Sequence, residues 1–441
     1  MESKRRNHIS LSLLVLVIAG VIAESCDTAN NLEPVYEDYF VRLYGDEGSQ
    51  EGVDLVVNEI DQTVVLLGTT TEPTGNRRLF LVKADWAGNL IWKKKLGGTN
   101  DVAKDIELSN DGGYIILAES QNDLATDATE NVKLIRATPE GDKVDSVLFG
   151  SVIDGNYGGD RPHSITPMGD SYIVTGSLEY PLIQADQGLQ KIAYLKLKFS
   201  SDLILDDNFN QEFSQAEFAN GIKTFRTSDS RIYTLGSDNK DENGNGPNYN
   251  FWFHGFDYLG GESSGGNETS GGNYWIGVDQ PGHDEILSAV CPAFGAGFFL
   301  VGVHIESTGR RDMYTAQVAI DQGELIRNDS LGKIVVIPVN ENRRILPVSV
   351  CRALTGRQGY LILGTEGEAG ARNIWLSKVN ITGESVYWSS LFGAGDLNDD
   401  RAGAVAELPD GHILVVGTVN VGVSNLKMGF FKLNAAGRFA E

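Results

Sequence analysis

The sequence predicts an all-β fold, a seven-bladed β-propeller, from a repeat that runs through nearly the whole chain. Successive repeats are separated by 50, 58, 60, 66, 62 and 53 residues, and each contains a short apolar run that ends in a small residue. A period of that size, filled by four short strands, is typical of a propeller blade. The small residues are Gly68, Ala118, Gly176, Gly236, Gly302, Gly364 and Gly417.

The first repeat displays all four strands. They are expected at residues 53–57, 63–68, 79–83 and 90–95, because each run is aliphatic, aromatic or β-branched and is bounded by turn formers. The third strand recurs at 133–136, 194–197, 252–256, 314–318, 375–379 and 430–433. The fourth recurs at 143–150 and 385–393, whereas the third and fourth repeats give no clear fourth strand.

The two ends of the chain predict how the propeller closes. The last repeat reaches its turn at 435–437 and stops at Glu441, before a full fourth strand. Residues 36–45 carry the fourth-strand pattern with its closing glycine. We therefore expect the N-terminal strand to complete the last blade, which would remove the exposed edges of an open array.

Strand order assigns the connections to two faces. The connections from the second to the third strand of a blade, and those from one blade to the next, share one face, which we call the loop face. The connections from the first to the second strand, and from the third to the fourth, share the opposite face, which we call the turn face. We expect tight turns on the turn face and long, dissimilar loops on the loop face, including enlarged connections to the next blade at 260–284 and 332–344. Since binding and catalysis concentrate on variable loops, function is expected on the loop face.

The first residues are typical of an export signal. A basic stretch at 4–6 precedes an apolar run at 11–23 that is too short to span a bilayer comfortably. Cleavage after Ala23 would release a soluble product, whereas lipidation of Cys26 would give a lipoprotein with a polar tether. We favour lipidation, although Glu24 departs from the usual pattern, and expect a signal peptide at 1–25, a tether at 26–33 and the propeller at 34–441.

Charge and cysteine content limit the partners. Without residues 1–25 the chain keeps 33 basic and 58 acidic residues, a net charge of −25. Such a surface repels nucleic acid and anionic lipid, so we expect no nucleic-acid partner and membrane contact only through a lipid anchor. Cys291 and Cys351 occupy similar positions in neighbouring repeats, and either a disulfide or two buried thiols fits them, with thiols favoured.

One loop of the fourth repeat has the start of a calcium-binding pattern. Asp241, Asn243 and Asn245 place oxygen ligands at alternate positions before a glycine. The twelfth position is Trp252 instead of a glutamate, so a complete EF-hand is excluded. A partial calcium site and a solvated loop both remain open, and no other cofactor is expected.

Aromatic residues near the same repeat are candidates for ligand binding. Tyr274 and Trp275 follow a Gly- and Ser-rich stretch, and Tyr249 falls on the same expected face. Exposed aromatic rings stack on sugars or anchor protein partners. The alternative is that Tyr274 and Trp275 fold back as a strand.

Catalytic motifs are absent from the sequence. His163 lies beside Asp160 and Arg161, but without a matching partner pattern a hydrogen-bonded strand start explains it better. Acidic residues recur near blade starts at Asp54, Asp105 and Asp284, which favours turn and capping roles over a catalytic carboxylate pair.

The recurring frame resembles a known family. The sequence is similar to the propeller-repeat lipoproteins of the Bacteroidota-type cell envelope. The similarity is carried by residues 111–117 and 81–92, together with Gly97 and Gly98. The resemblance covers most of 34–441 and implies an exported cell-envelope protein, an outer-membrane lipoprotein, without catalytic residues to carry over. We expect a non-enzymatic binding or scaffold module for a glycan or envelope protein. The alternative is a polysaccharide hydrolase or lyase that uses acidic residues near the central channel.

Overall fold

The structure, a computed structural model, describes most of the chain from residue 39 onward. The described residues are 39–121, 130–153, 156–179, 192–209, 212–213, 218–226, 232–239, 248–256, 273–277, 282–321, 324–326, 332–334, 344–393, 399–422 and 425–439. All of them belong to one compact unit, Tyr39–Glu441. A helix with the length and apolar character needed to cross a membrane does not occur among them.

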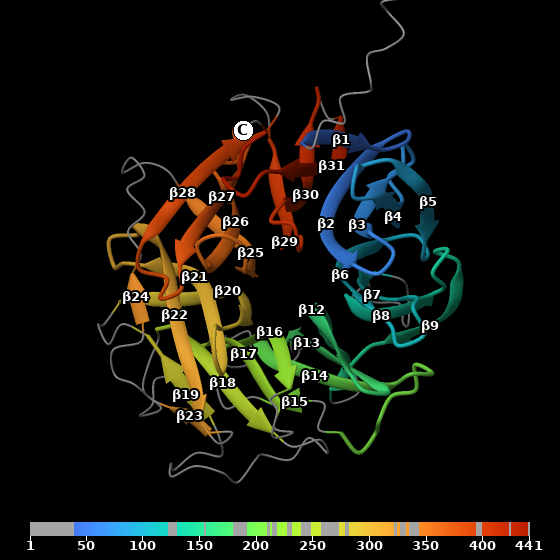
Figure 1. Cartoon of the computed structure of the whole chain (residues 1–441). Coiled ribbons are helices and arrows are strands. Elements are labelled where there is room, and N and C mark those ends of the chain that lie inside the picture. Colours follow the sequence, from blue (N-terminus) through green and yellow to red (C-terminus); the bar gives the residue numbers. More distant parts are fainter. Residues whose placement is uncertain are drawn as a thin grey trace, which may run out of the picture. The chain divides into compact units, whose positions relative to one another are not determined.

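The regular elements form seven antiparallel blades, which confirms the predicted fold class (Figure 1). Blades one and two consist of β2 (Ser49–Asn58), β3 (Thr63–Thr71), β4 (Arg77–Asp85) and β5 (Leu90–Leu96), then β6 (Asp101–Leu108), β7 (Tyr114–Ser120), β8 (Asn131–Ala137) and β9 (Lys143–Phe149). Blades three and four consist of β12 (Gly159–Met168), β13 (Ser171–Glu179), β14 (Ile192–Ser200) and β15 (Glu212–Phe213), then β16 (Ala219–Arg226), β17 (Ile232–Asp238), β18 (Asn250–Phe256) and β19 (Asn273–Ile276). A short hairpin, β10 (Val152–Ile153) with β11 (Asn156–Tyr157), lies between blades two and three.

The remaining three blades follow the same order. Blade five consists of β20 (Asp284–Pro292), β21 (Gly297–Ile305), β22 (Arg311–Asp321), β23 (Glu324–Ile326) and β24 (Gly332–Ile334). Blade six consists of β25 (Ile345–Ala353), β26 (Gly359–Glu366), β27 (Asn373–Asn380) and β28 (Val386–Phe392). Blade seven consists of β29 (Arg401–Glu407), β30 (Ile413–Asn420), β31 (Leu426–Leu433) and β1 (Phe40–Tyr44).

The first strand of each blade lies nearest the centre of the ring (Figure 1). Each of these inner strands contacts the inner strand of the next blade, and β29 contacts β2, so the contacts run around a closed circle. Consecutive repeats in the sequence are therefore neighbours in space, as expected for a propeller.

Blade seven combines strands from both ends of the described chain. β1 pairs antiparallel with β31 from Phe40 opposite Lys432 to Tyr44 opposite Met428. The Phe40 ring meets Phe430 edge to face at 5.2 Å, and the Tyr44 hydroxyl donates to the carbonyl of Gly88 in blade one at 2.8 Å. The strand thus buries aromatic side chains in blade seven and contacts its neighbour.

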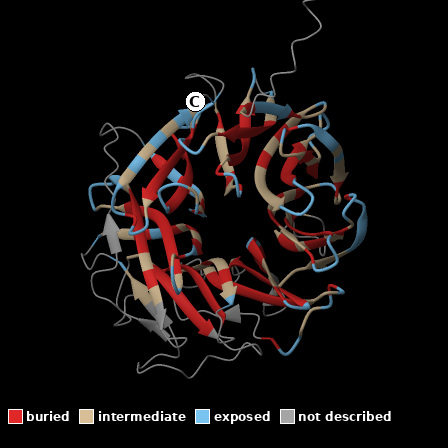
Figure 2. Cartoon of the chain, in the orientation of Figure 1, coloured by how far each residue is buried: buried red, intermediate tan, exposed pale blue. Residues whose placement is uncertain are grey.

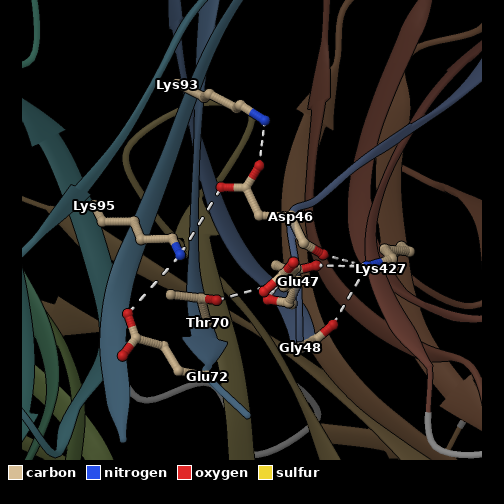
Figure 3. Close-up of polar contacts among 9 residues, drawn as sticks. Asp46, Glu47, Gly48, Thr70, Glu72, Lys93, Lys95 and Lys427 are labelled. Carbon is tan, nitrogen blue, oxygen red and sulfur yellow. Dashed lines mark hydrogen bonds and ion pairs between the residues drawn. The ribbon is translucent and has the colours of Figure 1, made fainter. Parts of the chain in front are cut away.

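A lysine fixes the connection between β1 and β2 (Figure 3). The Lys427 ammonium, from β31, donates to the carbonyl oxygens of Asp46 at 2.7 Å and Gly48 at 3.3 Å, and to Oε1 of Gln50 at 3.0 Å. The Asp46 carboxylate in turn pairs with Lys93 of blade one. One cation from the last blade therefore holds the segment that leads into the first.

The apolar core lies between blades. The second strand β3 and the third strand β14 are buried along almost their whole length, whereas the outer strands β5 and β28 expose alternate or successive side chains (Figure 2). Each main cluster of buried side chains joins two neighbouring blades. A strand covered on both sides needs an unbroken apolar run, which explains why the repeat appears in the sequence as runs.

The recurring small residue has a backbone cause. In every blade the pairing between the first two strands shifts by one residue, as between Gly52 and Asp54 opposite Gly68. A Cβ on Gly68 would lie 1.8 Å from the carbonyl oxygen of Glu51, and one on Gly236 would lie 1.9 Å from that of Asn220. At the six glycines the bulge brings a carbonyl too close for a side chain, and the seventh position, Ala118, has the smallest side chain, a methyl group.

The prediction that residues 260–284 and 332–344 are long connections to the next blade is wrong, because each range contains a strand. Asn273–Ile276 form β19, which pairs with β18, so the connection between these strands runs from the third strand to the fourth and not to the next blade. Gly332–Ile334 form β24, which pairs with β22, so the connection to blade six starts after Ile334. In blade three the connection from β14 to β15 is also longer than a tight turn. Trp275 of β19 packs against the buried Trp252 of β18, which outweighs the loop-like composition before it.

Cys291 and Cys351 are free thiols on neighbouring inner strands. Cys291 lies on β20 and Cys351 on β25. Burial raises the pKa of the Cys351 thiol to about 12, with Glu407 adding to the shift. These thiols are accordingly poor nucleophiles, in agreement with the favoured sequence interpretation.

Candidate functional site

The structure describes some of the predicted site residues fully, one only by its backbone, and others not at all. Tyr249 and Trp275 are described, Tyr274 is described only as a position on β19, and Cys26, Asp241, Asn243 and Asn245 lie outside the described residues. The structure therefore bears on the aromatic candidates and not on the calcium or lipidation residues.

Tyr249 lies on the loop face at the seam between blades four and five. Its backbone N–H donates to Oδ1 of Asp284 at 3.0 Å, and its carbonyl accepts from the N–H of Glu285 at 2.7 Å. The half-buried ring meets Phe218 edge to face at 4.8 Å. Burial, followed by the charge of Asp284, raises the pKa of the Tyr249 phenol. Two backbone bonds thus hold this tyrosine in place while part of its ring stays accessible.

Trp275 is in large part a packing residue. It lies opposite Trp252 in the β18–β19 register and packs with Tyr194, Ala219 and Trp252. Trp252 in turn stacks on His254 at 5.5 Å. The indole Nε1 of Trp275 is buried and makes no hydrogen bond to any residue that the structure describes. Of the two alternatives left open by the sequence, the fold-back as a strand is the one observed.

A histidine pair next to Tyr249 was missed by sequence reasoning. Glu285 on β20 lies directly opposite His304 on β21, and its Oε1 is 2.6 Å from Nδ1 of His304. The other ring nitrogen of His304, Nε2, is 3.1 Å from Nδ1 of His283. Glu285 and His304 are buried, whereas His283 is half-buried. The spacing of His283 and His304 in the sequence is not that of a known motif, and only the pairing of two strands brings them together.

The acidic residues of the first blades meet near the centre of the ring. Burial raises the pKa of Asp54 well above its usual range, and the nearby charge of Asp105 and a hydrogen bond between the two carboxyl groups raise it further. Each of the two carboxyl groups also accepts a hydrogen bond from the next blade. Asp54 accepts from the backbone N–H of Ile106 at 3.0 Å, and Asp105 accepts from the backbone N–H of Ile165 at 2.9 Å. These carboxyl groups therefore connect three consecutive inner strands.

Lys223 of blade four neutralises this cluster. Its ammonium donates to Oδ2 of Asp105 at 3.0 Å, to Oε1 of Glu107 at 2.9 Å and to the carbonyl of Ile165 at 3.0 Å. Burial opposes the charged lysine, but the two carboxylates outweigh it and raise the pKa of Lys223. The cluster thus spans blades one to four and serves as a charged connection between them.

Asp160 and His163 do not form a catalytic pair. Asp160 is buried and accepts from the N–H and the hydroxyl of Ser151, both at 2.6 Å. Burial raises the pKa of Asp160 to about 7. His163 is exposed on the same strand, β12. Asp160 thus has the bonded strand-start role that the sequence favoured.

These features define a seven-bladed β-propeller with a polar seam on its loop face. No model of a known protein family matches the chain, and no curated protein matches it. Among solved structures, an ulvan lyase from a polysaccharide lyase family is similar at 10% identity and a TM-score of 0.53, covering 90% of this chain and 96% of that chain. The Plexin A4 extracellular region is similar at 9% identity and a TM-score of 0.50, covering 87% of this chain and 46% of that chain.

A third similar structure is the β-propeller domain of the Trilobed protease from Pyrococcus furiosus, at 11% identity and a TM-score of 0.46, covering 90% of this chain and 97% of that chain. At these identities the likeness to the lyase and to the plexin shows the fold alone.

Proposed function

We propose that this protein is a non-enzymatic binding module that takes a glycan or protein partner through its loop face. The observation that supports this best is the seam between blades four and five. There two backbone hydrogen bonds, one to Asp284 and one from Glu285, hold the half-buried Tyr249 in place. A pre-positioned aromatic ring next to polar groups is a common anchor for sugars and protein partners.

Removal of the Tyr249 ring tests this function. The purified full chain is screened against a panel of soluble polysaccharides and envelope proteins, and Tyr249→Ala is compared for any ligand found. We expect at least a tenfold loss of affinity, since truncating an aromatic anchor costs about 2 kcal/mol or more. Tyr387→Ala on the outer strand β28 is the matched control and should bind normally. Equal binding by Tyr249→Ala would contradict the proposal.

A polysaccharide hydrolase or lyase is the second candidate. It is favoured by one observation, the raised pKa of Asp54 next to Asp105, because a carboxyl group that keeps its proton can act as a general acid. The two groups are hydrogen-bonded, however, whereas glycosidase carboxyl pairs are about 5 Å or more apart. Turnover of a polysaccharide in the same panel, lost in Asp105→Asn, would favour this candidate over the first.

We also propose that the protein is exported and attached to the outer membrane through lipid on Cys26. The proposal is supported by the basic and apolar N-terminal segment, the single cysteine after it and the polar tether. Labelling with a fatty-acid analogue in a bacterial host is expected to mark the wild-type chain and not Cys26→Ala. Equal labelling of both chains, or of neither, would argue against the anchor.

A further inference from the structure

Three side chains follow one another from Glu285 through His304 to His283. An ionised Glu285 only accepts hydrogen bonds, which places the proton of His304 on Nδ1, 2.6 Å from Oε1 of Glu285. Nε2 of His304 then carries no proton, and it lies 3.1 Å from Nδ1 of His283. Two imidazole nitrogens from different elements therefore lie next to each other at the loop face.

This arrangement differs from the same cross-strand position in blades one and two. That position pairs Gln50 with Thr70 in blade one and Asp101 with Ser120 in blade two. Both pairs are hydrogen-bonded through a hydroxyl, at 3.2 and 2.6 Å. Blade five instead has an acid, Glu285, opposite an imidazole, His304. Since a hydroxyl is enough to join the two strands in blades one and two, that function alone does not account for the histidine.

The surroundings of the two rings favour a bound cation. The carboxylates of Glu306, Asp312 and Asp284 lie near enough to His304 to act on its ring, and Arg310 opposes them. More negative than positive charge around two imidazole nitrogens favours a bound cation.

We propose that His283 and His304 bind a divalent transition metal ion of the zinc class, with Glu285 as the carboxylate that orients His304. Zinc at about 2.0–2.1 Å from each of two nitrogens holds them about 3.3 Å apart, close to the 3.1 Å between these rings. A buried carboxylate on the far nitrogen of a metal-binding histidine is a recurrent arrangement that fixes the tautomer. The inference does not depend on the proposed partner-binding function.

Binding requires a rearrangement of one proton. His283 coordinates through Nδ1 once its proton resides on Nε2, so both imidazoles bind as neutral ligands. An ion about 2.0–2.1 Å from both nitrogens lies to one side of the 3.1 Å line that joins them, and the two rings turn toward it. Within the described residues no third His, Cys, Asp or Glu completes a group. The other coordination positions therefore belong to water or to a ligand, and borderline metals that prefer imidazole should bind far better than Mg²⁺ or Ca²⁺.

Metal titration of the untagged full chain tests the site. We expect Zn²⁺ to bind with micromolar affinity at pH 7.5 in calorimetry, and Co²⁺ to give a visible absorption spectrum that Zn²⁺ abolishes. His283→Ala, at a half-buried position ahead of β20, should weaken binding at least tenfold without a change in melting temperature. Glu285→Gln should weaken it about 10- to 100-fold.

The matched control is His412→Ala, which removes a histidine paired with Asp410 in the β29–β30 turn. It should bind Zn²⁺ as the wild type does. The site is disproved if the wild-type chain fails to bind Zn²⁺ below millimolar concentration, or if His283→Ala binds it unchanged. Loss of binding in His412→Ala together with retention in His283→Ala would place the metal elsewhere and also overturn the proposal.

Discussion

Replacing Lys223 by methionine is expected to lower the free energy of unfolding by about 3–5 kcal/mol, the usual cost of removing one partner of a buried ion pair. The reason is the pair of carboxylates that the ammonium contacts, Asp105 at 3.0 Å and Glu107 at 2.9 Å. Without the cation these groups remain in a desolvated site with no opposite charge. Urea denaturation at pH 7 measures the loss.

The pH dependence of this loss has a definite sign. Burial raises the pKa of Glu107 and of Asp54, and removing Lys223 takes away an interaction that lowers both. The folded variant therefore binds protons more readily than the unfolded chain as pH falls, and its deficit relative to the wild type should shrink between pH 7 and pH 4. A deficit that grows on acidification would contradict the assigned role.

Lys94→Met is the matched control for that experiment. Lys94 forms an ion pair with Asp142 at the surface, with Lys94 partly exposed and Asp142 largely exposed. Such surface pairs contribute about 0–1 kcal/mol, so the control should unfold close to the wild-type midpoint. If Lys223→Met unfolds there as well, the cluster does not stabilise the inner strands.

Deleting residues 1–45 is expected to remove the cooperative unfolding of the propeller. The deletion takes away β1, which pairs with β31 and buries Phe40 and Tyr44 against Phe430. Loss of a single buried phenylalanine already costs about 3–5 kcal/mol. The edge of β31 is also left open, and open edges promote association between chains. Calorimetry and light scattering of the purified chain check both effects.

A chain that begins at residue 39 retains all of β1 and is the matched control for the deletion. Phe40→Ala separates the packing of the strand from its pairing, and it should lower stability by about 3–5 kcal/mol without aggregation. If the 1–45 deletion melts at the wild-type temperature, β1 contributes nothing to closing the ring.

Much of the fold could be predicted from local patterns. The small residue of each repeat was visible in the sequence, and the structure explains it by the bulge whose carbonyl approaches Gly68 and Gly236. Strands two and three were predictable because they are covered on both sides and must be apolar throughout. The fourth strands of blades three and four were not, because β15 has only two residues and β19 only four, and so short a run carries little pattern.

The candidate site was less predictable than the fold. Tyr249 was identified by its type and its expected face, but its bonds to Asp284 and Glu285 come from the meeting of two blades. The sequence left open whether Trp275 lies in a binding loop or in a strand, because its position opposite Trp252 depends on pairing that composition does not reveal. The contact of His283 with His304 joins residues without motif spacing.

The amino-acid sequence by itself determined the repeat, the number of blades, the order of their strands and the acidic charge of the chain. These follow from local alternation of apolar runs and turn formers, which every blade must satisfy separately. The tertiary structure alone decided that Lys223 reaches Asp105 across two blades and that Glu285 holds His304. Such contacts depend on the registers of neighbouring strands and on the closing of the ring, and no short stretch of the chain carries that information.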